Sequence, residues 1–216
     1  ENYLYVITDE STVNIFDITT KNMRSVGEFK PWNDANGWGM IETLFTFKEH
    51  LFIGSNAGML AYDISSPAAP VFLSSYSHMT SCDPVVANDE YAFITLRSGG
   101  NNCNWGNTNQ LDILDIKDIM NPKEITTFGL SNPHGLDIDS ENEILFVCDG
   151  FDGLKVYDFN DIQRVSSNRL DHYAGLETYD VIVNNGIAHV IGTEGLKQFT
   201  YDNTGKLSEL STIPLN

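Results

Sequence analysis

Residues 144–158 read ILFVCDGFDGLKVYD: an apolar run, a turn rich in Gly and Asp, and a second run that ends in Asp. In the second run Leu154 and Val156 alternate with Lys155 and Tyr157, which is the two-residue period of a β-strand with two distinct faces. Gly and Asp are residues that tight turns favour. The stretch therefore predicts a β-hairpin.

The same hairpin recurs along the chain. Runs equivalent to its second strand are TVNIFD (12–17), GMLAYD (58–63), QLDILD (110–115), GLKVYD (153–158) and GLKQFT (195–200). An apolar run precedes each of them, and in four of the five repeats a further strand begins near Ile41, Asp83, His134 or Tyr179. A more polar outer strand follows. Four short strands in about 40–50 residues are typical of a propeller blade.

We therefore predict an all-β chain, a β-propeller of five blades in a ring, each mostly of four antiparallel strands. The first blade lacks its innermost strand, which either comes from residues upstream of Glu1 or is absent in this form. One domain spans residues 1–216, with repeats at 1–37, 38–80, 81–131, 132–175 and 176–216. The Asp that ends four of the five hairpins is expected to close an Asx turn.

The composition limits the partners. The 216 residues include 12 Lys and Arg against 30 Asp and Glu, a formal charge of −18, which repels phosphate backbones and excludes nucleic acid. The acidic residues are scattered, so a hydrated surface and a site for calcium or a basic partner are both open interpretations. No apolar run approaches the ~20 residues of a membrane helix. Membrane attachment is expected only through an N-terminal lipid anchor outside this segment.

Three cysteines bear on the compartment. Cys82 and Cys103 lie in two loops that should share one rim, so we predict a disulfide between them and an oxidising compartment. Two free thiols are the first alternative, and a zinc site with His78 is the second, although a fourth ligand is missing. Cys148, in an apolar strand, is expected to be buried and inert.

Candidate site residues fall at the entrances of the innermost strands. The repeat alignment places Glu42, Asp83, His134 and Tyr179 there, around one axial mouth. Two carboxylates, an imidazole and a phenol would bind a cation, hold a sugar or exchange protons. The alternative is that they bond to loop backbones and plug the channel.

Loop residues extend this candidate site. Arg97 and Trp105 belong to the insertion at 97–110, and Trp38 lies in the loop KPWNDANGWGM. Indoles in loops stack on sugar rings or bury against a protein partner. The alternative is that they pack the loops onto blade edges.

The units LYVITDESTVNIFDI, LFIGSNAGMLAYDISSPAAP and LFVCDGFDGLKVYD resemble the LVIVD-repeat family of β-propellers across essentially the whole chain. The segments CDPVVANDEYAFITLRSG and NPHGLDID resemble its Bacteroidetes members in particular. That resemblance implies a secreted or lipid-anchored protein, in the periplasm or on the cell surface, and no defined activity. Thr200 departs from the repeat, which has Asp at this position.

Two functions follow as hypotheses. The first is a non-enzymatic binding module that recognises a protein or glycan through its rim loops. The second is a metal-assisted hydrolase or lactonase in which Glu42 and Asp83 bind a divalent ion and His134 is the general base. No nucleophile-elbow, phosphate-loop, zinc-protease or dinucleotide motif is present, so no cofactor or resident metal is predicted and the enzymatic hypothesis is the second choice. A rigid spacer is a third possibility.

Overall fold

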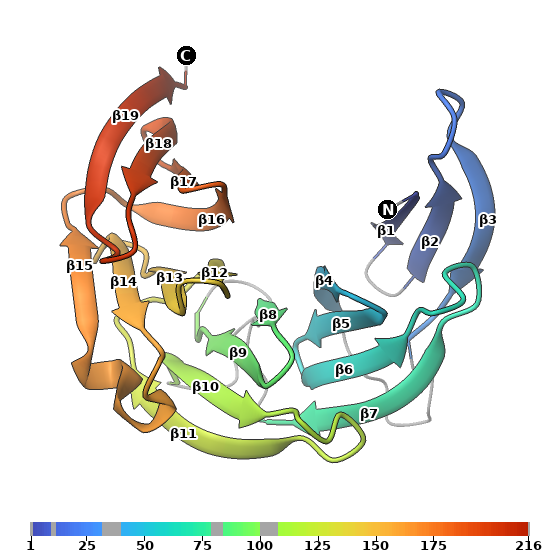
Figure 1. Cartoon of the computed structure of the whole chain (residues 1–216). Helices are drawn as coiled ribbons and strands as arrows, with labels where there is room; N and C mark the ends of the chain where they lie inside the picture. The colour runs from blue at the N-terminus through green and yellow to red at the C-terminus, as the bar shows by residue number, and fades with distance from the viewer. Residues whose placement is uncertain (1, 10–11, 32–39, 79–83, 100–107, 216) are drawn as a thin grey trace.

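The computed structural model describes residues 2–9, 12–31, 40–78, 84–99 and 108–215. Over these ranges the chain is almost entirely β-strand, arranged as five separate antiparallel sheets. Figure 1 shows the sheets as blades set around a common axis. The prediction of an all-β propeller with five blades is confirmed.

The blades follow one another in sequence. Blade 1 contains β1 (Tyr3–Asp9), β2 (Thr12–Asp17) and β3 (Arg24–Phe29). Blade 2 contains β4 (Ile41–Phe47), β5 (His50–Ser55), β6 (Gly58–Asp63) and β7 (Val71–Ser77). Blade 3 contains β8 (Val85–Ala87), β9 (Tyr91–Leu96), β10 (Gln110–Asp115) and β11 (Lys123–Gly129).

Blade 4 contains β12 (Leu136–Asp139), β13 (Ile144–Cys148), β14 (Leu154–Asp158) and β15 (Arg169–Tyr173). Blade 5 contains β16 (Thr178–Asn184), β17 (Ile187–Gly192), β18 (Gly195–Tyr201) and β19 (Leu207–Pro214). A short 3-10 helix, Ile162–Ser167, precedes β15. No helix in the described ranges is both long and apolar enough to cross a membrane.

Blade 1 differs from the others, as predicted. Its sheet order is β1-β2-β3, whereas each other blade has a further strand inside its hairpin. The prediction of a ring was wrong, because Figure 1 shows blades 1 and 5 at the two ends of an open arc.

Packing between neighbouring blades forms the core. In β9, Ile94 packs toward Phe52 of blade 2, while the next residue back, Phe93, packs toward Leu145 of blade 4. All four side chains are at most 1% exposed. The two-residue period of the strand therefore supplies an apolar surface on both faces of the blade.

The repeated Asp residues close Asx turns, which confirms that prediction. Each accepts a hydrogen bond at Oδ1 from the backbone N–H two residues later, at 2.9 Å for Asp17, 2.7 Å for Asp63, 3.0 Å for Asp115 and 2.7 Å for Asp158. In blade 5, where Thr200 replaces the Asp, the same turn is made by Asp202, whose Oδ1 lies 2.9 Å from the Thr204 nitrogen.

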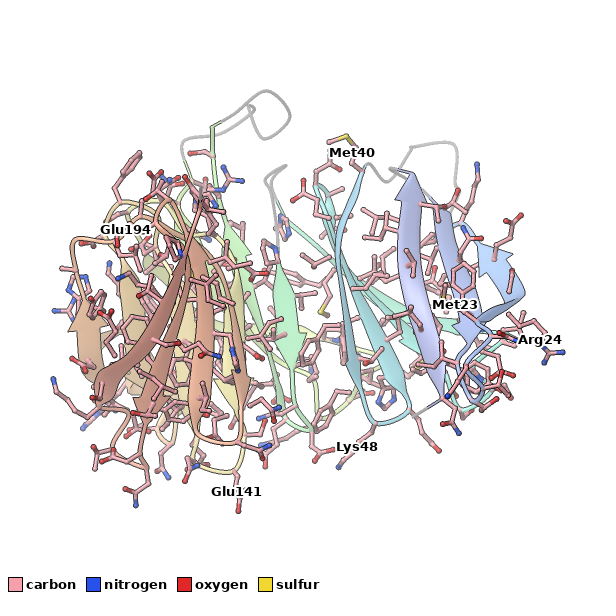
Figure 2. All side chains as sticks on the ribbon, turned by 90° about the horizontal axis from the view of Figure 1, so that it is seen from above. Met23, Arg24, Met40, Lys48, Glu141 and Glu194 are labelled. Atoms are coloured by element: carbon pink, nitrogen blue, oxygen red, sulfur yellow. The ribbon has the colours of Figure 1, made fainter. Side chains whose placement is uncertain are left out.

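The strand ends define two rims. Met40, just before β4, and Glu194, in the turn between β17 and β18, lie toward one rim in Figure 2. Lys48 and Glu141, in the turns after β4 and β12, lie at the other. The entrances of the innermost strands and the tips of the next hairpins thus share one rim, which we call the mouth rim.

We expect Phe93→Ala to lower the free energy of unfolding by about 3–5 kcal/mol, because it leaves a cavity between two blades. Phe151→Ala is the matched control, since Phe151 is 76% exposed, and should change it by less than about 0.5 kcal/mol. Guanidinium unfolding of both variants measures the difference. Equal effects would contradict the assignment of the core.

Candidate functional site

A cavity of about 230 Å³ opens at the mouth rim. It is lined by residues from blades 2 to 5: Glu42, Thr43, Pro84, Arg97, His134, Gly135, Tyr179 and Asp180. Each lies at or next to the entrance of an innermost strand, except Arg97, which follows β9. The antiparallel strand order brings these ends together, so residues far apart in sequence meet at the axis.

Four of the seven predicted binding residues therefore surround one cavity: Glu42, Arg97, His134 and Tyr179. Trp38, Asp83 and Trp105 lie outside the described residues, and so do Cys82 and Cys103 of the predicted disulfide. Cys148 is a free, fully buried thiol, as expected, and burial raises its pKa. The function of the four cavity residues stays a prediction.

The backbone of His134 is fixed by two different blades. Its N–H donates to the carbonyl of Cys148 at 2.7 Å, and its carbonyl accepts from the buried hydroxyl of Thr95 at 2.6 Å. The next residue, Gly135, donates to the carbonyl of Tyr179 at 2.9 Å, which adds a third blade. The imidazole therefore starts from a well-defined position at the junction of blades 3, 4 and 5.

The His134 ring is held in its neutral form. Burial, and then the positive charge of Arg97, lower its pKa from 6.5 to about 4. Nε2 lies 3.2 Å from the side-chain nitrogen of Asn132, and because an amide nitrogen only donates, the ring proton is on Nδ1. The ring also packs against Tyr179, with 5.5 Å between the ring centroids. His134 thus offers one N–H donor in a fixed orientation.

A second cavity of about 320 Å³ continues down the axis and shares Thr43, Pro84 and Asp180 with the first. Its other carboxylate is Asp137, whose pKa burial raises to about 6 despite hydrogen bonds from the backbone of Val183 and Ile138. Desolvation also raises the pKa of Asp180, but this side chain is exposed to the axial space.

Gly135 creates the room for Asp180. A Cβ at residue 135 would lie 1.9 Å from the Oδ1 atom of Asp180, so a side chain there would displace that carboxylate. Its φ is not among the positive values, which means that close approach, rather than backbone conformation, requires glycine. His134 and Gly135 therefore act together: His134 lines the cavity, and Gly135 leaves the space that the Asp180 carboxylate occupies.

A buried ion-pair network stabilises the segment that carries Asn132 and His134. Asp149 is fully buried and accepts backbone hydrogen bonds from Ser131 and Asn132, the latter at 2.7 Å. The Lys155 ammonium lies 2.5 Å from Asp149 and 2.5 Å from Asp152. Burial lowers the pKa of Lys155, but the two carboxylates outweigh it and the net shift is upward. The hairpin at 144–158 thereby positions Asn132, the partner of His134.

Sequence reasoning missed several of these residues. Thr43 and Asp180 line the cavity, and each follows a predicted site residue, Glu42 or Tyr179, by one position. The strand pairing has a β-bulge at both places, and a repeat alignment does not show a bulge. Asp149 and Lys155 are expected only as residues of the predicted hairpin. The charged Lys155 lies between the apolar residues Leu154 and Val156, and a lysine that is buried in this way requires a counter-ion.

No group of three or more His, Cys, Asp or Glu side chains in the described part of the chain is placed to hold a metal ion. Glu42 and His134 share the cavity, but Arg97 lines it too and opposes a divalent cation by charge repulsion. The third predicted ligand, Asp83, is not among the described residues. The donor set seen here does not fit a metal.

Comparison with known proteins gives information about the fold alone. No protein-family model and no curated protein sequence matches the chain, so the resemblance to the LVIVD-repeat family stays a prediction. A functionally unknown protein from Desulfotomaculum acetoxidans is similar in structure, with a TM-score of 0.75 at 10% identity, over 99% of this chain and 67% of that one.

Two further solved structures are similar. A periplasmic gluconolactonase from Pseudomonas aeruginosa has a TM-score of 0.69 at 13% identity, over 99% of this chain and 66% of that one. Raptor from Chaetomium thermophilum has a TM-score of 0.74 at 15% identity, over 100% of this chain and 20% of that one. The chain spans about two thirds of the length of the gluconolactonase. At 10–15% identity the likeness shows the propeller fold alone.

We expect Lys155→Met to destabilise the protein by about 3–5 kcal/mol, because it leaves the Asp149 carboxylate buried without its counter-ion. Lys117→Met is the matched control: Lys117 pairs with Glu90 at 2.7 Å, but both side chains are more than half exposed. Removing that pair should cost at most about 1 kcal/mol. Guanidinium unfolding would contradict the buried network if both variants lost the same stability.

We expect the imidazole of His134 to titrate near pH 4 in an NMR titration. The neutral form is favoured in the folded state, so this group's contribution to stability is present above about pH 6.5 and falls as the pH drops toward 4. Arg97→Gln should raise the His134 pKa, and Arg24→Gln, an exposed residue of blade 1, should not. A His134 pKa near 6.5 in the unmodified protein would contradict this environment.

Proposed function

We propose that this protein binds a glycan at the mouth rim without chemical conversion. Glu42, Arg97, His134 and Tyr179 are the proposed contacts in the described cavity, with Trp38, Asp83 and Trp105 as further proposed contacts on the loops. A volume of about 230 Å³ is below the roughly 300–1,000 Å³ of pockets that enclose drug-sized ligands. It suits a single sugar unit at the end of a longer chain.

The chemistry of the lining supports a polyhydroxylated ligand. Carboxylates of Glu42 and Asp180 would accept hydrogen bonds from hydroxyls, while the Arg97 guanidinium and the Nδ1–H of His134 would donate them. The Tyr179 side chain is 38% exposed, which leaves an aromatic surface for the apolar face of a sugar ring. Donors, acceptors and an aromatic face in one small cavity favour a neutral sugar over an anion.

The observation that carries this proposal is the lining of the cavity, where the charged Glu42 and Arg97 meet the exposed ring of Tyr179. The neutral imidazole of His134 argues against the enzymatic alternative. A histidine with a pKa of about 4 is a weak base at neutral pH, whereas an effective general base has a pKa near the working pH. The second candidate, a lactonase with Glu42 and Asp83 on a divalent ion, requires His134 to take up a proton. One structural neighbour is named a gluconolactonase, which keeps that candidate as an alternative to test.

We further propose an extracytoplasmic location. It rests on the predicted Cys82–Cys103 disulfide and on the resemblance to secreted propellers. A glycan partner agrees with this location, since cell-surface glycans are met outside the cytoplasm.

We expect the protein to bind a restricted set of structures on a glycan array, and Glu42→Gln and Arg97→Gln each to weaken that binding at least about tenfold, or about 1.4 kcal/mol. Glu141→Gln and Arg24→Gln, which remove the same charges away from the mouth rim, should leave it unchanged. Binding insensitive to all four variants would overturn the site. Tight divalent-ion binding by calorimetry together with lactone hydrolysis, both lost in Glu42→Gln, would favour the lactonase instead.

A further inference from the structure

The cavity at the mouth rim, which we call the mouth cavity, opens into a deeper one. The innermost strands β4, β8, β12 and β16 face the axis in Figure 1, and all four line the deeper cavity of about 320 Å³, which we call the axial cavity. The two cavities share Thr43, Pro84 and Asp180. Most of the axial lining is apolar: Leu44, Phe45, Pro84, Val85, Val86, Leu136, Val181 and Ile182. A ligand that occupies both cavities therefore needs a polar part and an apolar part.

Asp180 offers a hydrogen-bond acceptor where the two cavities meet. Its Oδ1 atom accepts a hydrogen bond from the N–H of Val181 at 2.9 Å, and Gly135, which has no side chain, leaves space for the carboxylate. Within the part of the chain that the structure describes, Oδ2 has no hydrogen-bond partner. The side chain is exposed to the axial space. This second oxygen is therefore open to an N–H or O–H group of a ligand.

Thr43 supplies a hydroxyl at the same junction. Its Oγ1 atom is shielded from water and has no hydrogen-bond partner among the described residues. A buried hydroxyl without a partner costs free energy. Rotation about the Cα–Cβ bond to another staggered rotamer redirects the hydroxyl. Because Thr43 lines both cavities, a carbonyl oxygen at the junction would give this hydroxyl the acceptor that it lacks.

An amide that carries an alkyl chain matches this junction. Its N–H would donate to Asp180, its carbonyl would accept from Thr43, and its alkyl chain would lie along the apolar wall of the axial cavity. A hydroxyl at the same place has no apolar part to bury. A free ammonium group also lacks an apolar part, and it would lie near the positive charge of Arg97 in the mouth cavity. The amide is thus the group that uses all three features.

We propose that the sugar bound at the mouth rim is an N-acylated amino sugar. This inference rests on the glycan function proposed above and names the class of sugar. The ring occupies the mouth cavity beside Tyr179, the amide lies between Asp180 and Thr43, and the acyl chain extends into the axial cavity. A volume of about 320 Å³ is more than one methyl group fills, so the site also accommodates acyl chains longer than acetyl.

Calorimetric titration of the 216-residue protein tests the class of sugar. The probes are the N-acetyl derivatives of glucosamine, galactosamine and mannosamine, each compared with its free amine and with the corresponding neutral hexose. We expect at least one N-acetyl sugar to bind at least about tenfold more tightly than both of its counterparts, because only the amide pairs with both side chains and buries an apolar group. Replacement of its acetyl group by propanoyl and then butanoyl should strengthen binding about fourfold for each added methylene.

A protein variant tests the hydroxyl separately. Thr43→Val keeps the shape of the side chain, and it should weaken binding of the N-acetyl sugar about threefold to tenfold without changing the affinity for the neutral hexose. The midpoint of thermal unfolding should not fall, because this hydroxyl has no partner to lose among the described residues. Thr46→Val, at an exposed position of the same strand, is the matched control and should change neither quantity.

Several outcomes would overturn this inference while the glycan function stands. They are equal affinity for the N-acetyl sugar and its neutral hexose, tighter binding of the free amine, and glycan-array binding confined to structures without an N-acylated amino sugar. A lower unfolding midpoint in Thr43→Val with an unchanged preference for the acyl group would show that the hydroxyl is only structural. Absence of glycan binding both on the array and in the titrations would overturn the proposed function and this inference together.

Discussion

The structure depends on one constraint: each blade is apolar on both faces and is stable only between two neighbours. Phe93 and Ile94 are adjacent in β9, yet they belong to different inter-blade cores. No single sheet holds its own hydrophobic core, so burial is complete only where blades stack. The exposed Ile182 and Ile191 of blade 5, at 62% and 52%, show the same constraint at the end of the arc.

The same stacking explains where polar chemistry collects. Strand faces are used for blade packing, so polar side chains with functional potential are found at strand entrances and in turns. Glu42, His134 and Tyr179 reach one cavity because each lies at or next to the entrance of an innermost strand. The buried pair of Asp149 and Lys155 is the exception within a blade, and it orders the segment that carries His134. A structural ion pair in one hairpin thus determines the geometry of a cavity formed by several blades.

The repeats made the fold predictable, whereas features that occur only once in the chain were not predicted. Five similar hairpins, four of them ending in Asp, specify the strand order and the Asx turns, because each copy supports the others. The gathering of Glu42, His134 and Tyr179 followed from the same alignment, while Arg97 was predicted from its place in the insertion after β9. The open arc could not be predicted from the alignment, because the curvature depends on the twist and spacing of the blades and the repeat sequence does not specify these. Asp180 was missed for a different reason: it depends on a bulge in β16 and on the missing side chain of Gly135.

Two irregularities in strand pairing give the mouth cavity much of its lining. The register of β4 against β5 shifts between Ile41 and Thr43, and that of β16 against β17 shifts between Thr178 and Asp180. In a regular strand consecutive side chains point to opposite faces, and a bulge changes the direction of a side chain. Because of these shifts two consecutive residues of each strand line the cavity, Glu42 with Thr43 in β4 and Tyr179 with Asp180 in β16. The local departures from the repeat, rather than the repeat itself, therefore decide which polar groups meet there.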